Sequence, residues 1–205
     1  MGYTTDFTGN FQLSPQPTPA QEAYINQFAH TRRVRRNAEI TKTLPDPIRE
    51  AVGLPVGTDG AYYVADGDSG RFTGKAVDLI PKPNDIIDIN TPPGMPTYEE
   101  RKHMDYAAQH EAEQKLIAEG EVQPSLWCQW VIDNDEGKLV LAWDGGEKFY
   151  NYAEWLQYLI KHFFSVWGIE VNGEVEWQGE DSSDFGLMVV EDSVLTVKLG
   201  KKVFE

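Results

Sequence analysis

The sequence predicts an α+β fold, in which an antiparallel sheet of about five strands packs against two main helices and a polar helix is added on the surface. Residues 125–200 contain five short segments with apolar residues at alternate positions, which is typical of half-buried strands. Residues 152–167 instead repeat their apolar residues at helical spacing. The order strand, strand, helix, strand, strand, strand favours an antiparallel sheet with helices on one face.

Two hairpins are predicted within this region. The first joins residues 126–132 to residues 139–143 through a turn at 134–137. The second joins residues 187–190 to residues 194–199 across Asp192 and Ser193, so that Met188 faces Val197 and Val190 faces Leu195. We expect both pairs to point inward and Lys198 to point outward, because alternate side chains lie on opposite faces of a strand.

Three helices are predicted from their end signals. Thr18 and Pro19 begin a first helix that we expect to continue to about Lys42. Thr97 and Glu100 form a capping box before a polar helix over residues 98–119, whose thin apolar stripe is typical of a surface helix or of one that binds a partner. Asn151 caps the third helix, which Gly168 ends.

The remaining segments are less regular. Residues 3–13 are expected to form an extended N-terminal arm anchored by aromatic side chains, residues 48–54 a short helical turn and residues 61–65 a short strand. The glycines and prolines of residues 66–96 predict a loop-rich stretch. We therefore expect one α+β domain over residues 1–205, with residues 97–121 as a helical insertion.

The composition excludes several classes of protein. A formal net charge of −15 opposes direct nucleic-acid binding, because the phosphate backbone is itself negatively charged. No stretch has the roughly 18 apolar residues of a membrane span, so no membrane association is expected. The single cysteine, Cys128, cannot form an internal disulfide, which favours a cytoplasmic location and a buried, inert thiol.

Charge is unevenly distributed along the chain. Residues 31–50 carry six basic and three acidic side chains, whereas residues 111–205 carry seven basic and nineteen acidic ones. On the predicted first helix, Arg32, Arg33 and Arg36 lie on adjoining turns, half buried, and require an anion. That anion is either a phosphate or carboxylate of a ligand or, slightly favoured, a carboxylate from the acidic C-terminal half.

The loop between the second strand and the third helix combines aromatic, charged and glycine residues. Such a loop could line a pocket that stacks a planar ligand. Its candidate binding residues are Trp143, Asp144, Glu147, Lys148 and Tyr150. The alternative, which is the more common outcome for such residues, is that Trp143 and Phe149 belong to the core and the charges are solvated.

An acidic run surrounds Trp177 and includes Glu174, Glu176 and Glu180, followed by Asp181 and Asp184. Paired carboxylates can act as general acid and base or hold a divalent cation. A solvated strand face predicts the same alternation, since Glu174 and Glu176 lie opposite Val175 and Trp177. We therefore assign Glu174 and Glu180 as candidate ligand-binding residues and no residue as catalytic.

No metal or cofactor site is predicted. The segments 66–70 and 133–137 resemble the start of calcium loops but lack the later acidic ligands, so they are interpreted as turns. His103 and His110 lie seven residues apart on one predicted helix, about 10 Å along its axis, which is too far for two ligands of one metal. Zinc, phosphate-loop, dinucleotide and Ser-His-Asp signatures are missing from the sequence.

Three sequence stretches together resemble a family of uncharacterised hypothetical proteins of bacteria and phages. The stretches are Leu-Trp-Cys-Gln-Trp from residue 126, Trp-Asp-Gly-Gly-Glu-Lys-Phe-Tyr-Asn-Tyr from residue 143 and Asn-Gly-Glu-Val-Glu-Trp-Gln-Gly-Glu-Asp from residue 172. Members also begin like Met-Gly-Tyr-Thr-Thr-Asp-Phe and carry an arginine pair in the first helix. The resemblance covers most of the chain and implies no activity, and the helix over 98–119 departs from the family pattern as an insertion.

The sequence leads to three functional hypotheses. The first is a non-enzymatic binding or inhibitor protein, linked to phage counter-defence, that binds a host protein or a small anionic ligand. The second is a hydrolase of a small substrate that uses the acidic cluster over 174–184. The third is a structural protein that forms homo-oligomers through the helix over 98–119.

Overall fold

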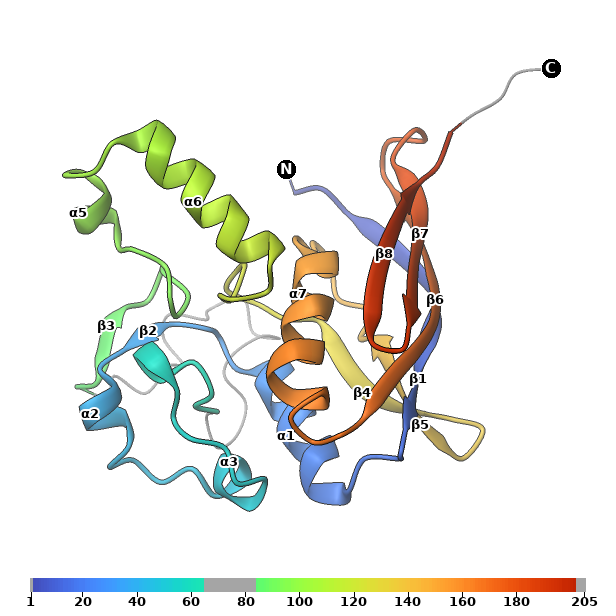
Figure 1. Cartoon of the computed structure of the whole chain (residues 1–205), viewed down its shortest axis with the longest axis horizontal. Helices are drawn as coiled ribbons and strands as arrows, with labels where there is room; N and C mark the ends of the chain where they lie inside the picture. Colours follow the sequence, from blue (N-terminus) through green and yellow to red (C-terminus); the bar gives the residue numbers. More distant parts are fainter. Residues whose placement is uncertain (1, 65–83, 202–205) are drawn as a thin grey trace. The chain divides into compact units, whose positions relative to one another are not determined.

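The computed structural model describes residues 2–64 and 84–201 and divides the chain into two compact units (Figure 1). We call residues 1–18 together with 129–205 the sheet unit, and residues 19–128 the middle unit. Each unit contains its own set of secondary-structure elements.

The sheet unit contains six antiparallel strands in the spatial order β4-β5-β1-β6-β7-β8 (Figure 1). The strands are β1 (Thr5–Ser14), β4 (Trp130–Asp135), β5 (Lys138–Trp143), β6 (Glu170–Gly179), β7 (Phe185–Glu191) and β8 (Val194–Leu199). This arrangement confirms the predicted α+β class with an antiparallel sheet. The additional strand is β1, which the sequence indicated only as an extended arm and which lies between β5 and β6.

One helix packs against one face of this sheet. Helix α7 (Tyr152–Leu159) continues into the π-helical turn η2 (Ile160–Phe164), and Gly168 follows with a positive φ of 68°. The aromatic ring of Phe7 lies 4.9 Å from that of Tyr152 and 5.8 Å from that of Trp130. Trp130 also donates a hydrogen bond from Nε1 to the carbonyl of Tyr152 at 2.8 Å, so aromatic side chains join the sheet to its helix.

The hairpin predictions were largely correct. Residues 187–190 and 194–199 pair in the expected register, with Met188 opposite Val197 and Val190 opposite Leu195. Val197 shares the inner face with its buried partner Met188, as predicted, but β8 is the edge strand of the sheet and leaves this side chain 44% exposed. The first hairpin is also present, but its first strand begins at Trp130 and not at residue 126.

The middle unit consists of short elements joined by long connections. They are α1 (Pro19–His30), β2 (Arg35–Arg36), α2 (Ala38–Thr41), α3 (Pro47–Ala51), the 3₁₀ turn η1 (Thr58–Gly60), β3 (Ile86–Asp88), α5 (Tyr98–Arg101) and α6 (Tyr106–Ala118). Strands β2 and β3 pair with each other, and α3 provides the helical turn expected over residues 48–54.

The first helix ends at His30, and the predicted extension to Lys42 was wrong. Beyond His30 the backbone amide of Arg33 donates to the carbonyl of Leu126 at 2.9 Å, and that of Arg35 donates to Thr91 at 2.8 Å. These long-range hydrogen bonds satisfy the backbone in an extended form, so tertiary pairing replaces the helix that local propensity favoured.

Three further local predictions are corrected. Residues 61–64 contain a turn at 61–62 and no strand, because the amides of Tyr62 and Tyr63 donate to the carbonyls of Val56 and Gly60. The helix over 98–119 is two helices, since Asp105 caps the start of α6; the predicted capping box at Thr97 is confirmed at α5. Asn151 does precede α7, but in a left-handed conformation with no capping hydrogen bond from its side chain.

Some predictions lie outside the described part of the chain or stay untested. The segment 66–70 and most of the loop-rich stretch over 66–96 fall within residues 65–83, which the structure does not describe. The single domain and the insertion over 97–121 remain predictions. Within the described residues, every helix is too short or too polar to cross a lipid bilayer.

Candidate functional site

The two faces of the sheet differ sharply in chemistry. On β1, Phe11 and Leu13 are buried toward α7, whereas Asp6, Thr8 and Gln12 are exposed on the opposite side. On β6, Val175 and Trp177 are buried and Glu174, Glu176 and Gln178 are exposed. This alternation follows from the twofold repeat of a strand, and we call the side that carries Asp6 and Glu176 the polar face.

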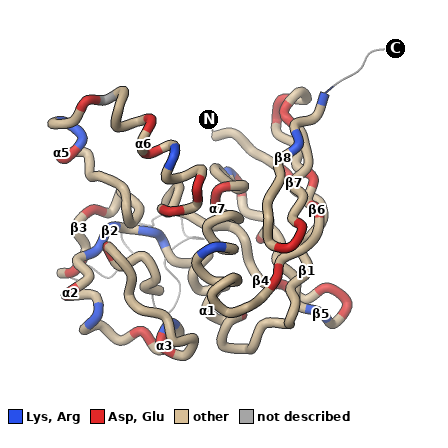
Figure 2. The backbone as a smooth tube through the Cα atoms, viewed as in Figure 1, with Lys and Arg blue, Asp and Glu red and all other residues tan. Residues whose placement is uncertain are grey.

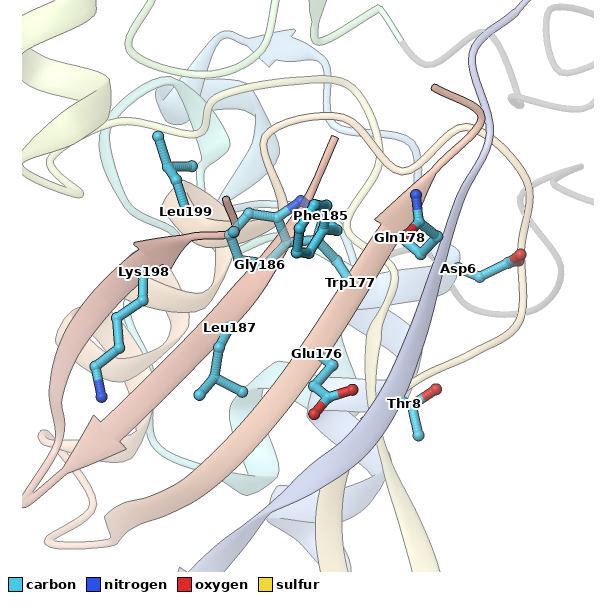
Figure 3. Close-up of a pocket in the computed structure, with 11 residues that line it drawn as sticks. Asp6, Thr8, Glu176, Trp177, Gln178, Phe185, Gly186, Leu187, Lys198 and Leu199 are labelled. Atoms are coloured by element: carbon cyan, nitrogen blue, oxygen red, sulfur yellow. The ribbon is translucent and has the colours of Figure 1, made fainter. Parts of the chain in front are cut away.

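A groove of about 530 Å³ lies along the polar face, over β1, β6, β7 and β8 (Figure 3). Strand register builds its floor from one row of four side chains, because Thr8 pairs with Glu176, Glu176 with Leu187, and Leu187 with Lys198. Asp6, Gln178 and Phe185 form the next row, by the same pairing. The centre of the groove is therefore apolar and is flanked by charged side chains on both sides.

Charge is concentrated on this face. Strands β1, β6, β7 and β8 carry six charged side chains, and the register places all of them on the polar face. They are Asp6, Glu170, Glu174, Glu176, Glu191 and Lys198. Figure 2 marks the acidic positions of these strands in red. Five carboxylates against one lysine give the face a negative potential that attracts cations.

Two glycines leave room for an aromatic ring on each face of the sheet near the groove. A Cβ atom on Gly186 would lie 2.2 Å from the Trp177 ring, and one on Gly200 would lie 2.0 Å from the Phe185 ring. The aromatic rings thus lie directly over backbone where any larger residue would collide. Phe185 pairs with Gln178 on the polar face and lines the groove, whereas the Trp177 ring is buried on the opposite face beneath it.

The loop from Trp143 to Tyr150 makes hydrogen bonds within the sheet unit. Trp143 Nε1 donates to Gln129 Oε1 at 3.1 Å and to the Gly146 carbonyl at 3.2 Å. Asp144 accepts from the amide of Gly146 at 2.8 Å, and Tyr150 accepts from the amide of Tyr3 at 3.2 Å.

The other residues of this loop also contact residues of the sheet unit. Phe149 is buried, with its ring 5.5 Å from that of Trp130. Lys148 lies 4.0 Å from the exposed carboxylate of Glu147. These contacts account for the aromatic and charged residues of the loop by packing and local pairing, and its residues do not line the groove.

The acidic run is divided between two roles. Glu174 and Glu176 are exposed on the polar face, and Glu176 lines the groove. Glu180 accepts from the amide of Thr4 at 2.8 Å, while Asp184 accepts from the Tyr3 hydroxyl at 2.7 Å and from Trp177 Nε1 at 3.2 Å. The hydrogen bond to Asp184 raises the pKa of Tyr3, since it stabilises the protonated hydroxyl. Glu180 and Asp184 thereby fix the start of β1.

The three candidate arginines lie in the middle unit, in extended chain after α1. Arg36 forms a buried ion pair with Asp85 at 2.7 Å and lies over the Tyr63 ring at 4.3 Å. Figure 2 shows the basic segment at β2 beside acidic positions at β3. The carboxylate for Arg36 thus comes from this unit and not from the acidic C-terminal half.

The other two arginines bind uncharged groups. Arg33 donates to Gln123 Oε1 at 3.1 Å and to the carbonyls of Ala61 and Tyr63, both at 2.9 Å. Arg32 donates to the carbonyl of Ile89 at 3.1 Å, and burial lowers its pKa. The structure therefore does not bring the three guanidinium groups together at one anion site.

Several groove residues were missed by sequence reasoning. Asp6, Thr8, Phe185, Leu187 and Lys198 line the groove, and none was a candidate. The signal was present in residues 5–13, where polar and apolar residues alternate, but that segment was interpreted as an arm outside the sheet. Among the described residues, no group of three or more His, Cys, Asp and Glu side chains could hold a metal ion.

Comparison with protein-family models, with curated proteins and with solved structures finds no match to this chain. The resemblance to bacterial and phage proteins therefore stays a prediction.

Proposed function

We propose that this protein is a non-enzymatic binding protein whose polar face holds a basic, partly apolar segment of a partner protein. One observation carries the proposal: the five carboxylates of strands β1, β6 and β7 share a face with an apolar groove. A segment that alternates apolar and basic side chains matches this surface in both chemistry and spacing.

The apolar and the charged parts of the polar face contribute to binding in different ways. Phe185 and Leu187 are only partly buried, so a partner side chain laid over them removes apolar surface from water and adds affinity. Asp6 and Glu176 flank this strip and would pair with lysine or arginine of the partner. Exposed ion pairs contribute little affinity each but steer association and select against acidic partners.

The positions of the charged side chains give less support to the two alternatives, a hydrolase and a protein that binds an anionic ligand. A hydrolase needs carboxylates that converge on one substrate, whereas Glu174 is exposed on the polar face and Glu180 and Asp184 hold the N-terminal strand. An anionic ligand needs accessible cations, whereas Arg33 and Arg36 are buried in hydrogen bonds and ion pairs. An inhibitor that covers the basic surface of a nucleic-acid-binding host protein, as in phage counter-defence, is one form of the proposed function.

A titration with two designed peptides tests the proposal. One labelled peptide alternates lysine and leucine, and the other alternates glutamate and leucine. We expect the full-length protein to bind the first peptide at least about tenfold more tightly, with affinity that falls as salt screens the charges. Fluorescence anisotropy at low and high ionic strength measures both effects.

Two variants locate the binding. Glu176→Lys reverses a charge in the groove and should weaken binding of the lysine peptide about tenfold, since it places like charges opposite each other. Glu136→Lys is the matched control, because Glu136 is exposed in the turn between β4 and β5 and does not line the groove. Equal binding by both variants, or equal binding of both peptides, would contradict the proposal.

A further inference from the structure

The middle unit contains a second groove, of about 490 Å³, that is separate from the polar face in residues and in chemistry. Its apolar lining comes from Met95, Met104, Ala112 and Leu116. Methionine side chains are flexible and polarisable, so they adapt to aliphatic ligands of different shapes. The groove is therefore suited to an aliphatic chain.

Two polar side chains of α6 also line this groove. Gln109 and Glu113 are one helical turn apart, and they are 8% and 7% exposed. Gln109 Nε2 donates to Glu113 Oε1, which leaves Gln109 Oε1 as an acceptor. Within residues 2–64 and 84–201, this buried oxygen has no hydrogen-bond partner. A buried acceptor without a donor is costly, and a ligand that donates a hydrogen bond would remove that cost.

The charges around the groove define the sign of the ligand. The lining contains three carboxylates, Asp59, Glu100 and Glu113, against one guanidinium, that of Arg35. Arg35 is already paired, with Nε 3.4 Å from Asp59 and Nη1 bonded to Glu100. Among the described residues, the cation nearest Glu113 is Arg101, with Nη2 at 3.4 Å and a side chain that is 41% exposed. The net charge of the lining is therefore negative, which favours binding of a cation.

We infer that this groove binds a primary ammonium group on an aliphatic chain. An ammonium group has three donors and no acceptor, so it can satisfy Gln109 Oε1 and pair with Glu113 at the same time. The aliphatic chain then lies against Met95, Met104 and Leu116. Two sources share this chemistry: a free alkyl diamine and the lysine side chain of a protein.

Methionine methyl groups report directly on this groove. In full-length protein labelled with ¹³C at the methionine methyls, Met95 and Met104 lie in the groove, while Met188 is buried in the sheet unit. We expect n-hexylammonium to shift the Met95 and Met104 signals and to leave Met188 unchanged. Hexan-1-ol, which has the same chain without the charge, should bind about tenfold more weakly or worse.

Variants of α6 test the assigned contacts. Glu113→Gln and Gln109→Leu should each weaken hexylammonium binding about tenfold, because each removes one partner of the ammonium group. Glu111→Gln is the matched control, since Glu111 is an exposed acid on the same helix. An unchanged Met188 signal in each variant reports that the sheet unit is intact, and the far-ultraviolet circular dichroism spectrum reports the helices.

Three results would overturn the inference. They are equal binding of the alcohol and the ammonium, unchanged binding in Glu113→Gln, or shifts at Met188 without shifts at Met95 and Met104. Comparison of 1,5-diaminopentane with Nα-acetyl-lysine methylamide then assigns the source, because the tighter probe identifies a free diamine or a protein lysine. Glu176→Lys should not alter these titrations, so failure here is distinct from failure of the function proposed for the polar face.

Discussion

The interiors of the two units contain different types of side chain. In the described part of the sheet unit the buried polar side chains are Thr5 and Gln129, and the rest of its core is apolar and rich in aromatic rings. The middle unit buries six charged side chains among residues 19–64 and 84–128, which are Arg33, Arg36, Asp46, Arg49, Asp85 and Glu113. Burial of a charge costs free energy that only a close partner offsets, so the middle unit depends on paired groups and the sheet unit on apolar area.

This difference explains which unit keeps charged side chains available to a partner. The arginines of the middle unit are used inside it, as in the 2.8 Å pair of Arg49 with Asp46, whose carboxylate also caps α3. Burial raises the pKa of Asp46, while Arg49 and the backbone amides act in the opposite direction. The described part of the sheet unit has no charged side chain in its interior, and the five carboxylates of β1, β6 and β7 lie on the polar face, where they are available to a partner.

The largest expected effect is in the charged interior. Asp85→Ala leaves the Arg36 guanidinium buried without its carboxylate and also removes the hydrogen bond from Thr41. We expect a loss of about 3–5 kcal/mol in the free energy of unfolding, measured by urea denaturation.

The matched control for this change is Glu39→Ala, which breaks an exposed pair with Lys42 and should cost less than about 1 kcal/mol. If the two variants lost equal stability, burial of charge would not distinguish the two units.

A smaller effect is expected in the apolar unit. Gly186→Ala places a Cβ atom 2.2 Å from the Trp177 ring, which is packed in the core of the sheet unit. Overpacking of this kind should lower the free energy of unfolding by about 1–3 kcal/mol. It should also weaken binding of the lysine peptide, because the backbone of Gly186 lines the groove and would be displaced.

Thr196→Ala, an exposed change on β8, is the control and should stay within about 0.5 kcal/mol of wild type. Full stability and unchanged binding in Gly186→Ala would show that the Trp177 ring can move without cost.

Low pH should destabilise the middle unit by protonating Glu100. Hydrogen bonds from the Thr97 amide and from Arg35 lower the pKa of Glu100 from its ordinary 4.5 to about 2. Because the folded-state pKa is depressed, its stabilising contribution is present above the unfolded-state value and is lost as pH falls from about 4.5 to about 2.

Glu100→Gln removes this contribution. The variant should therefore be less stable than wild type near neutral pH, and the difference should shrink when denaturation is repeated at about pH 3. A difference that is independent of pH would mean that the charge of Glu100 has no part in holding α5.

The smallest effect is expected at Asn151. Its φ of 57° suits glycine, and its side chain makes no capping hydrogen bond, so Asn151→Gly should change stability by less than about 0.5 kcal/mol.

Asn37 is the comparison residue, because its side chain accepts from the amides of Glu39 and Ile40 at the start of α2. Asn37→Ala should cost about 1 kcal/mol by thermal or urea denaturation. A larger loss for Asn151→Gly than for Asn37→Ala would reverse this assignment of the two caps.

The sequence by itself determined the features that depend on near neighbours. The alternation over 187–199 predicted the last hairpin and its register, and Thr97 with Glu100 predicted the cap of α5, because such patterns are set within a few residues. The exposed alternation of Glu174 and Glu176 was predicted for the same reason.

Only the tertiary structure decided the features that depend on distant partners. Residues 5–14 became a central strand because β6 pairs with them along ten residues, and the chain after His30 left the helix because Leu126 and Thr91 accept its amides. The groove is a row of side chains from four strands, from Thr8 through Glu176 and Leu187 to Lys198. Strand order created it, and no local pattern specifies which strands become neighbours.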